Sequence, residues 1–275
     1  MSGPSLYEVL RDAIRASTPV ALATVVVGPP DRLGAKLLSG PSMSALGSLG
    51  DPDLDRVVER DSLGELEAGR SGTRHYGLRG EARQEELSVF VESFAPPPRL
   101  VIFGAVDFTA ALMRVGKLLG FHVTVCDARA VFTTRSRFPL ADELVVDWPN
   151  RYLDARGADL GLRDAICVLT HDAKFDIPAL VSALATNAGY IGAMGSRRTT
   201  EERNLRLLDA GVAPGELARI LSPIGVDIGA RTPEETAVSI CAEIIALRTG
   251  RRPPSLRDAA GPIHAAPAAG HRGGS

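Results

Sequence analysis

The sequence predicts an α/β protein in which a C-terminal parallel sheet with helices on both faces follows a smaller α+β domain. Beyond residue 99, continuous apolar strands alternate with helical segments, a pattern typical of parallel sheets covered on both faces. The strand–helix–strand unit over 99–127 is the strongest of these signals. The segment 95–98, Ala-Pro-Pro-Pro, favours an extended linker and separates this part from the region before it.

The N-terminal domain, predicted over residues 1–95, mixes helical and strand patterns. Residues 5–16 carry apolar side chains on one helical face, and Pro19 ends that helix. Residues 19–28 are rich in β-branched side chains and predict a buried strand. The remaining segments predict a hairpin of short strands (33–39 and 43–46), a helix over 51–68, and strands at 72–78 and 87–94.

The C-terminal domain, predicted over residues 99–250, repeats strand and helix in turn. The expected strands are 99–105, 121–129, 143–147, 164–172 and 189–195, and the expected helices are 108–120, 176–186, 199–210 and 233–248. Residues 251–275 consist largely of Pro, Ala, Gly, Arg and His. Because this tail lacks the apolar content needed to build a core, we predict that it is disordered.

Composition excludes several classes of protein. The 275 residues are 45% apolar and 23% charged, and 31 basic against 33 acidic side chains leave a net charge of −2, so bulk nucleic-acid binding is not expected. No run reaches the roughly 20 apolar residues that span a bilayer. The N-terminus lacks the pattern of a secretion signal, which favours the cytoplasm. The three cysteines (Cys126, Cys167 and Cys241) are far apart and predict buried thiols, without disulfides or a metal site.

The turn after the first strand of the C-terminal domain is Rossmann-like but incomplete. A dinucleotide fingerprint needs Gly-x-Gly-x-x-Gly, so that the backbone approaches a diphosphate. Here only Gly104 is present, and Val106 and Asp107 work against a bound diphosphate. Asp127, with Arg129 nearby, stands where an acid often meets a ribose hydroxyl. An NAD(P) cofactor is therefore supported by Asp127 and disfavoured by Val106.

Polar residues follow the fourth strand at the carboxyl edge of the sheet, where ligands bind in open α/β folds. His171 is a candidate for moving a proton or holding a ligand oxygen, and Asp172 stands beside it. The alternative is that His171 is a loop residue that caps the next helix.

A second candidate segment follows the fifth strand. Gly195, Ser196, Arg197 and Arg198 combine backbone N–H groups, a helix dipole and two cations, which together predict an anion site. Thr199 with Glu202 fits a capping box and places a helix N-terminus here. The alternative is a solvated basic turn.

The third segment is the glycine-containing loop over 222–235. Thr232 and Pro233 suit the N-cap and first position of the last helix. Asp227 and Arg231 are expected to face the same cleft, with Gly229 between them. The alternative is a tight structural turn.

These segments together resemble a known family. Residues 100–247 are similar to the accessory proteins of xanthine dehydrogenase and carbon monoxide dehydrogenase maturation, the XdhC/CoxI family. The first 95 residues match it in outline, through VALATVV and LGAKLL. The matching elements are RLVIFGA, GFHVTVCDAR, RFPLADELVV, VLTHDAKFDIPAL, YIGAMGSRRTTEERNLRL and ILSPIGVDIGARTPEETAVSICAEIIA.

The resemblance implies a cofactor chaperone and not a catalyst. Such a protein would bind the molybdenum cofactor (molybdopterin), assist its sulfuration and deliver it to the large subunit of a molybdenum hydroxylase. A cysteine desulfurase is a further candidate partner, and a homodimer is expected. Carried over by position, the cofactor-binding candidates are Gly104, Asp127, Arg129, His171, Asp172, Gly195, Ser196, Arg197, Arg198, Asp227, Gly229 and Arg231.

The chain departs from the family pattern at two places. Family members carry Ser-Gly-Gly-Cys, and often a later Cys-Gly-Gly, in the first domain, whereas the corresponding stretches here, 44–51 and GEARQEELSV, contain no cysteine. Gly-Ala-Gly-His is replaced by Gly104-Ala105-Val106-Asp107. Two alternatives therefore remain: an NAD(P)-dependent oxidoreductase, and a cofactor-free scaffold that binds a dehydrogenase subunit.

Overall fold

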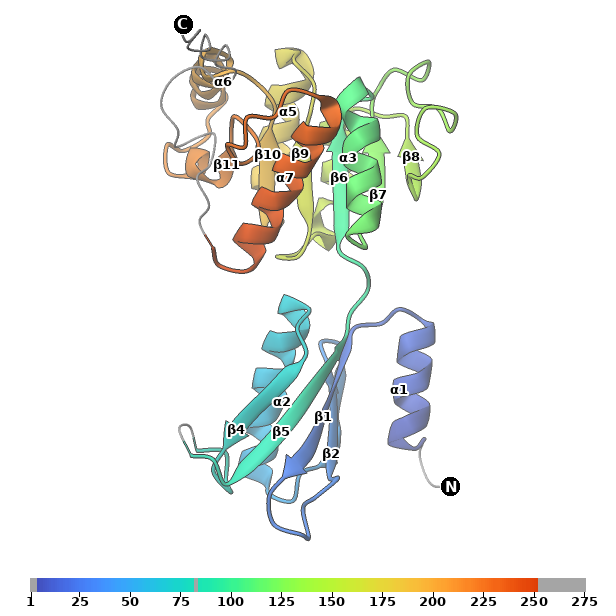
Figure 1. Cartoon of the computed structure of the whole chain (residues 1–275), viewed down its shortest axis with the longest axis vertical. Coiled ribbons are helices and arrows are strands. Elements are labelled where there is room, and N and C mark those ends of the chain that lie inside the picture. The colour runs from blue at the N-terminus through green and yellow to red at the C-terminus, as the bar shows by residue number, and fades with distance from the viewer. Residues whose placement is uncertain (1–3, 82–83, 252–275) are drawn as a thin grey trace, which may run out of the picture. The chain divides into compact units, whose positions relative to one another are not determined.

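The computed structural model describes residues 4–81 and 84–251. The tail predicted to be disordered lies, from residue 252 onward, outside the described residues. The chain divides into two compact units, the first ending at Pro96 and the second beginning at Pro97, as Figure 1 shows. Each unit has its own sheet and is described separately.

The first unit is an antiparallel sheet of five strands with two helices, which confirms the predicted α+β class. Its strand order is β3-β2-β1-β5-β4. β1 pairs with β2 and β5, and each pairing is antiparallel. The elements in chain order are α1 (Leu6–Arg15), β1 (Val20–Val27), β2 (Lys36–Gly40), β3 (Met43–Ser48), α2 (Pro52–Ala68), β4 (Gly72–Tyr76) and β5 (Leu87–Phe94).

Alternation along the central strand divides the core of this unit. Ala21, Ala23 and Val25 pack in a cluster with α2 on one face of the sheet. Val20 and Leu22 point to the other face, where α1 contributes apolar side chains. Successive side chains of a strand point to opposite faces, so the segment 20–25, which is apolar except for Thr24, contributes to the core on both faces of the sheet.

Two buried hydroxyl groups in this unit, Ser39 on β2 and Ser62 on α2, lack hydrogen-bond partners among the described residues. A buried polar group without a partner costs about 1–3 kcal/mol. We therefore expect Ser62→Ala to stabilise the unit by about 1 kcal/mol, to which the higher helix propensity of alanine contributes. Hydrogen exchange of the β1 amides in the full chain measures the change, since protection reports unfolding of the surrounding unit.

Ser39→Ala is the matched test, because a strand position gains nothing from helix propensity. A smaller stabilisation is expected there. A loss of protection in both variants would show that the two hydroxyl groups stabilise the unit.

The second unit contains a parallel sheet of six strands in the order β11-β10-β9-β6-β7-β8, which confirms the predicted Rossmann-like class. Its regular elements are β6 (Arg99–Phe103), α3 (Asp107–Leu118), β7 (His122–Cys126), β8 (Glu143–Val145), α4 (Pro149–Arg156), β9 (Ala165–Val168), α5 (Ala173–Leu184), β10 (Tyr190–Ala193), α6 (Arg197–Asp209), β11 (Ile220–Leu221) and α7 (Pro233–Arg248). Sequence patterns missed α4 and β11 because both are short.

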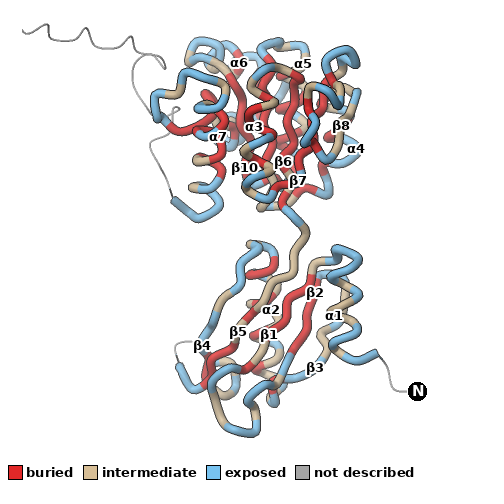
Figure 2. The backbone as a smooth tube through the Cα atoms, turned by 45° about the vertical axis from the view of Figure 1, so that its right-hand side comes forward, coloured by how far each residue is buried: buried red, intermediate tan, exposed pale blue. Residues whose placement is uncertain are grey.

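Helices cover both faces of this sheet. One core cluster joins the sheet to α3 and α7, and a second joins it to α4, α5 and α6. The central strands β6, β7, β9 and β10 are almost entirely buried, as the red stretches of backbone in Figure 2 show, whereas the edge strand β8 is half-buried. Because helices cover both faces of the sheet, these strands show no alternation of apolar and polar residues in the sequence.

The three cysteines are buried, as expected. Burial raises the pKa of Cys126 and of Cys241 to about 12, and it raises the pKa of Cys167 well above its ordinary value. These thiols therefore stay protonated at neutral pH and are poor metal ligands or nucleophiles. Among the described residues, no helix combines the length and the apolar character needed to cross a bilayer.

Candidate functional site

The loops that carry the candidate residues leave the carboxyl edge of the parallel sheet. The strand order reverses between β6 and β9, which is the switch point at which ligands bind in such sheets. Gly104 follows β6, Asp127 follows β7, His171 follows β9 and Gly195 follows β10. The topology thus brings these residues to one edge, but their side chains are engaged in different ways.

The turn after β6 is closed by the protein's own groups. A Cβ atom on Gly104 would lie 2.7 Å from Cγ2 of Thr170, so glycine is needed for the close approach to the end of β9. The hydroxyl of Thr109 donates to the carbonyl of Gly104 at 2.5 Å. Val106 stands at the N-cap of α3 and offers no side-chain hydrogen bond. The close approach to Thr170 therefore explains why this position is a glycine.

Asp127 is saturated by internal donors. Its carboxylate accepts hydrogen bonds from the Ala105 N–H at 2.7 Å, from the Arg129 N–H at 2.9 Å and from two guanidinium nitrogens of Arg129 at 2.9 and 2.7 Å. Burial opposes ionisation, but these donors outweigh it and hold the pKa of Asp127 below its ordinary value. A ribose hydroxyl would have to displace one of them, so the pair holds the turn together.

His171 and Asp172 are both exposed. Asp172, and not His171, caps the next helix: its side chain accepts the N–H of Lys174 at 3.0 Å. The suggested capping role of His171 is therefore wrong, because the short carboxylate at the N-cap position reaches the free N–H groups of α5.

The residue that caps the N-terminus of α6 is also not the one that the sequence predicted. Ser196 is the N-cap residue and exchanges hydrogen bonds with Thr199, so the expected pairing of Thr199 with Glu202 is wrong by one turn. Glu202 instead pairs with Arg198 at 2.9 Å along the outside of the helix, where the Arg198 side chain is 88% exposed. Arg197 is half-buried. The two arginines therefore do not share one environment.

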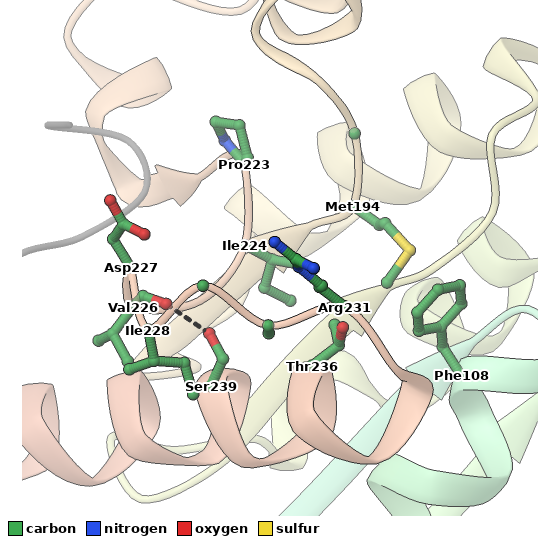
Figure 3. Close-up of a pocket in the computed structure, with 13 residues that line it drawn as sticks. Phe108, Met194, Pro223, Ile224, Val226, Asp227, Ile228, Arg231, Thr236 and Ser239 are labelled. Atoms are coloured by element: carbon green, nitrogen blue, oxygen red, sulfur yellow. Dashed lines mark hydrogen bonds between the residues drawn. The ribbon is translucent and has the colours of Figure 1, made fainter. Parts of the chain in front are cut away.

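A pocket of about 120 Å³ gathers part of the candidate set (Figure 3). Gly195, Asp227, Gly229 and Arg231 contribute to its wall. In Figure 3 the Arg231 side chain projects over the pocket, whereas the Asp227 carboxylate points away from it. Side chains that the sequence patterns did not indicate complete the lining: Phe108, Met194, Pro223, Ile224, Val226, Ile228, Thr236 and Ser239, together with Ala230.

The loop above this pocket is anchored to α7 by a buried carboxylate. Glu243 is 2% exposed and accepts hydrogen bonds from the N–H of Gly225 at 2.8 Å and from the hydroxyl of Tyr190 at 2.7 Å. Ser239 donates to the carbonyl of Val226 at 2.7 Å. Sequence reasoning missed both anchors. The one available signal was an acidic residue within the apolar segment CAEIIA.

The other end of the loop is ordered by the start of α7. Glu235 accepts hydrogen bonds from the backbone N–H groups of Arg231 at 2.7 Å and Thr232 at 3.1 Å. These N–H groups hold the pKa of Glu235 below its ordinary value. Thr232 is the N-cap and Pro233 follows it, as predicted. The backbone of Arg231 is thereby fixed while its guanidinium group stays directed toward the pocket.

A buried guanidinium group connects three strand ends beneath the site. Arg203 of α6 is 6% exposed and donates to the Met194 carbonyl after β10, to Ser222 Oγ after β11 at 2.9 Å and to Asp176 Oδ2 at 3.3 Å. Asp176 also accepts the hydroxyl of Thr170 after β9. The sequence RRTTEERNLRL is so rich in charge that nothing in it singles out Arg203.

Burial works against both charges of this pair. It raises the pKa of Asp176 and lowers the pKa of Arg203, and their mutual attraction offsets only part of each change. Within the described ranges, no group of three or more His, Cys, Asp or Glu side chains is arranged to hold a metal ion. The site is thus a small, partly apolar pocket whose loops rest on buried polar anchors.

Comparison with known proteins adds to this geometry. Residues 100–244 match the XdhC Rossmann domain, and residues 13–77 match the XdhC and CoxI family. A probable xanthine dehydrogenase subunit of Bacillus subtilis is 36% identical over 164 residues, which are 60% of this chain and 47% of that protein. The molybdenum cofactor insertion chaperone PaoD of Escherichia coli is 26% identical over 162 residues, 59% of this chain and 44% of PaoD.

The chain spans about half the length of the curated relatives that it matches. A crystal structure described as a xanthine dehydrogenase from Bacillus halodurans superposes with a TM-score of 0.53, covering 89% of this chain and 96% of that one. Its sequence identity is 23%, so this likeness shows the fold alone.

Proposed function

The chain belongs to the XdhC and CoxI family, and from this membership we propose that it is an accessory protein in the maturation of a molybdenum hydroxylase. In this role it binds the molybdenum cofactor, assists its sulfuration and hands it to the hydroxylase. The observation that carries the proposal is that both family domains occur in one chain that is also similar to a named molybdenum cofactor insertion chaperone.

The pocket agrees with part of such a cargo. A cavity of about 150 Å³ accommodates a benzene ring, so a pocket of about 120 Å³ takes no more than one ring of a larger molecule. Arg231 supplies hydrogen-bond donors there. The described lining contains no cysteine, and the chain's three thiols are buried and protonated elsewhere. The chain therefore suits the organic portion of the cofactor and offers molybdenum no thiolate.

The proposal also names partners. Delivery requires contact with the large subunit of a hydroxylase of the xanthine or carbon monoxide dehydrogenase type, and sulfuration requires a sulfur donor such as a cysteine desulfurase. A homodimer in the cytoplasm is the working form that we propose. The nicotinamide-dependent oxidoreductase loses support, because internal donors saturate Asp127 and Val106 occupies the N-cap of α3.

The test is retention of the cofactor. The full chain is purified from cells that make the molybdenum cofactor and from cells that do not, and bound pterin is measured by fluorescence after oxidation. We expect pterin only in the first sample. Its absence there, while a competent family member retains it, would favour the cofactor-free scaffold.

Arg231→Ala should lower retention about tenfold, because a hydrogen bond from a charged group contributes about 1.5–3 kcal/mol. Arg198→Ala is the matched control. Its guanidinium group is bound to Glu202 and faces solvent, so retention should not change. Equal losses in the two variants would show that the loss is not specific to Arg231 and would contradict our assignment of cofactor binding to its loop.

A further inference from the structure

The deep wall of the pocket is apolar and well packed. Met194, Ile224 and Val226 are 8%, 4% and 6% exposed, and Phe108 adds an aromatic ring from the first turn of α3. Such a wall accepts a flat ring and disfavours a phosphate group, since a charge moved from water into apolar surroundings loses its hydration. The pocket therefore favours the ring of a phosphorylated heterocycle over its phosphate group.

Among the described residues that line the pocket, Arg231 is the only cation. Its side chain is exposed, and its guanidinium group makes no ion pair or side-chain hydrogen bond with any residue that the structure describes. The Asp227 carboxylate points away from it (Figure 3). A planar set of N–H donors above an apolar wall suits the carbonyl and nitrogen edge of a heterocycle.

Resting on the proposed function, we propose that this pocket binds the pterin ring of the cofactor, with Arg231 donating to its carbonyl edge and the phosphate remaining outside. Phe108, Met194 and Ile224 enclose one ring of the bicycle, which is the most that a volume of about 120 Å³ takes. The hydrogen bond from the Arg231 N–H to Glu235 fixes the backbone from which the donor group projects. The chain thus recognises the organic end of the cofactor and leaves its other groups accessible to a partner.

The experiment uses the full chain and free pterin, a fluorescent probe without phosphate or metal. Thr236 lies in the lining on α7, so Thr236→Trp should fill the pocket and raise the Kd for pterin about tenfold or more. Val238→Trp is the matched control, since Val238 lies on the same helix, 50% exposed and outside the lining. Its Kd should stay within about twofold of the unchanged protein.

Ala230→Trp fills the pocket from the loop and guards against a folding defect in the helix variant. Guanosine and inorganic phosphate serve as competitors, because guanine shares the amino-carbonyl edge of pterin and phosphate represents the other end of the cofactor. We expect guanosine to displace pterin, because it offers Arg231 the same edge, and we expect phosphate not to displace it. The assignment would be overturned if phosphate displaced pterin, or if the protein bound guanosine but did not bind pterin.

The outcomes separate this inference from the proposed function. If both filled variants keep the cofactor during purification and bind pterin as well as the unchanged protein, the pocket assignment is wrong and the maturation role stands. If the unchanged protein binds pterin in the pocket but retains no cofactor in cells, the maturation role fails and the pocket assignment stands. If the unchanged protein neither binds free pterin nor retains the cofactor, both the pocket assignment and the maturation role are wrong.

Discussion

Arg203→Met should destabilise the C-terminal unit by about 3–5 kcal/mol, the usual cost of removing one partner from a buried ion pair. The substitution keeps the length of the side chain but leaves the Asp176 carboxylate buried without its cation. It also removes the donors to Ser222 and to the Met194 carbonyl, so the ends of β10 and β11 lose their common anchor. The loss of stability should therefore be accompanied by weaker ligand binding.

Trp148 is the only tryptophan of the chain and lies in this unit, so its fluorescence during urea unfolding measures the free energy of unfolding. Arg198→Met, on the exposed side of the same helix, should change stability by less than about 0.5 kcal/mol. The double variant Asp176→Leu with Arg203→Met should regain much of the loss, because burial already disfavours both charges. A double variant as unstable as the sum of the two single variants would show that the pair does not act as a unit.

Gly225→Ala should destabilise the same unit by about 2–4 kcal/mol through two effects that act together. Gly225 has φ = +100°, a conformation that alanine adopts only with strain, and its added Cβ would lie 2.4 Å from Ser239 Oγ. The displaced serine would release the Val226 carbonyl, and the N–H of Gly225 would move from the Glu243 carboxylate. Since this loop forms part of the pocket wall, pterin binding should fall as well.

Gly229→Ala is the control for backbone strain alone. Gly229 has φ = +69°, but, apart from its chain neighbours, no described residue has an atom within 4 Å of the added Cβ, so a cost of only about 1 kcal/mol is expected. The difference between the two variants, measured by the fluorescence of Trp148 in urea, isolates the contact with Ser239. Equal costs would mean that the loop is not held against α7 as the hydrogen bonds indicate.

The order of strands and helices was accessible from the sequence because local patterns carry it. The run RLVIF is apolar at every position after its first, and such a strand is stable only where both faces of a sheet are covered. The N-cap of α7 was equally readable, since Thr232 and Pro233 act through their own backbone neighbours. The short helix α4 was missed because an eight-residue helix shows too little periodicity.

The polar partners across the fold were not accessible in this way. Asp127 had the position of a ribose acceptor, yet the chain brings the Ala105 N–H and the Arg129 guanidinium group onto its carboxylate and uses its acceptor capacity. Arg203 and Glu243 do not stand out in the sequence, but their neighbours in space come from strand ends and loops far along the chain. No local pattern reports such a pairing.

Sequence was therefore sufficient for the family, for the alternation of strand and helix and for the N-cap of α7, because each depends on residues close together along the chain. Folding selected, from a dozen candidates at one edge of the sheet, the few that share a pocket with Arg231. The reason is physical: burial and hydrogen bonding consume polar groups wherever distant segments meet, and only the groups left facing a cavity are available for a ligand.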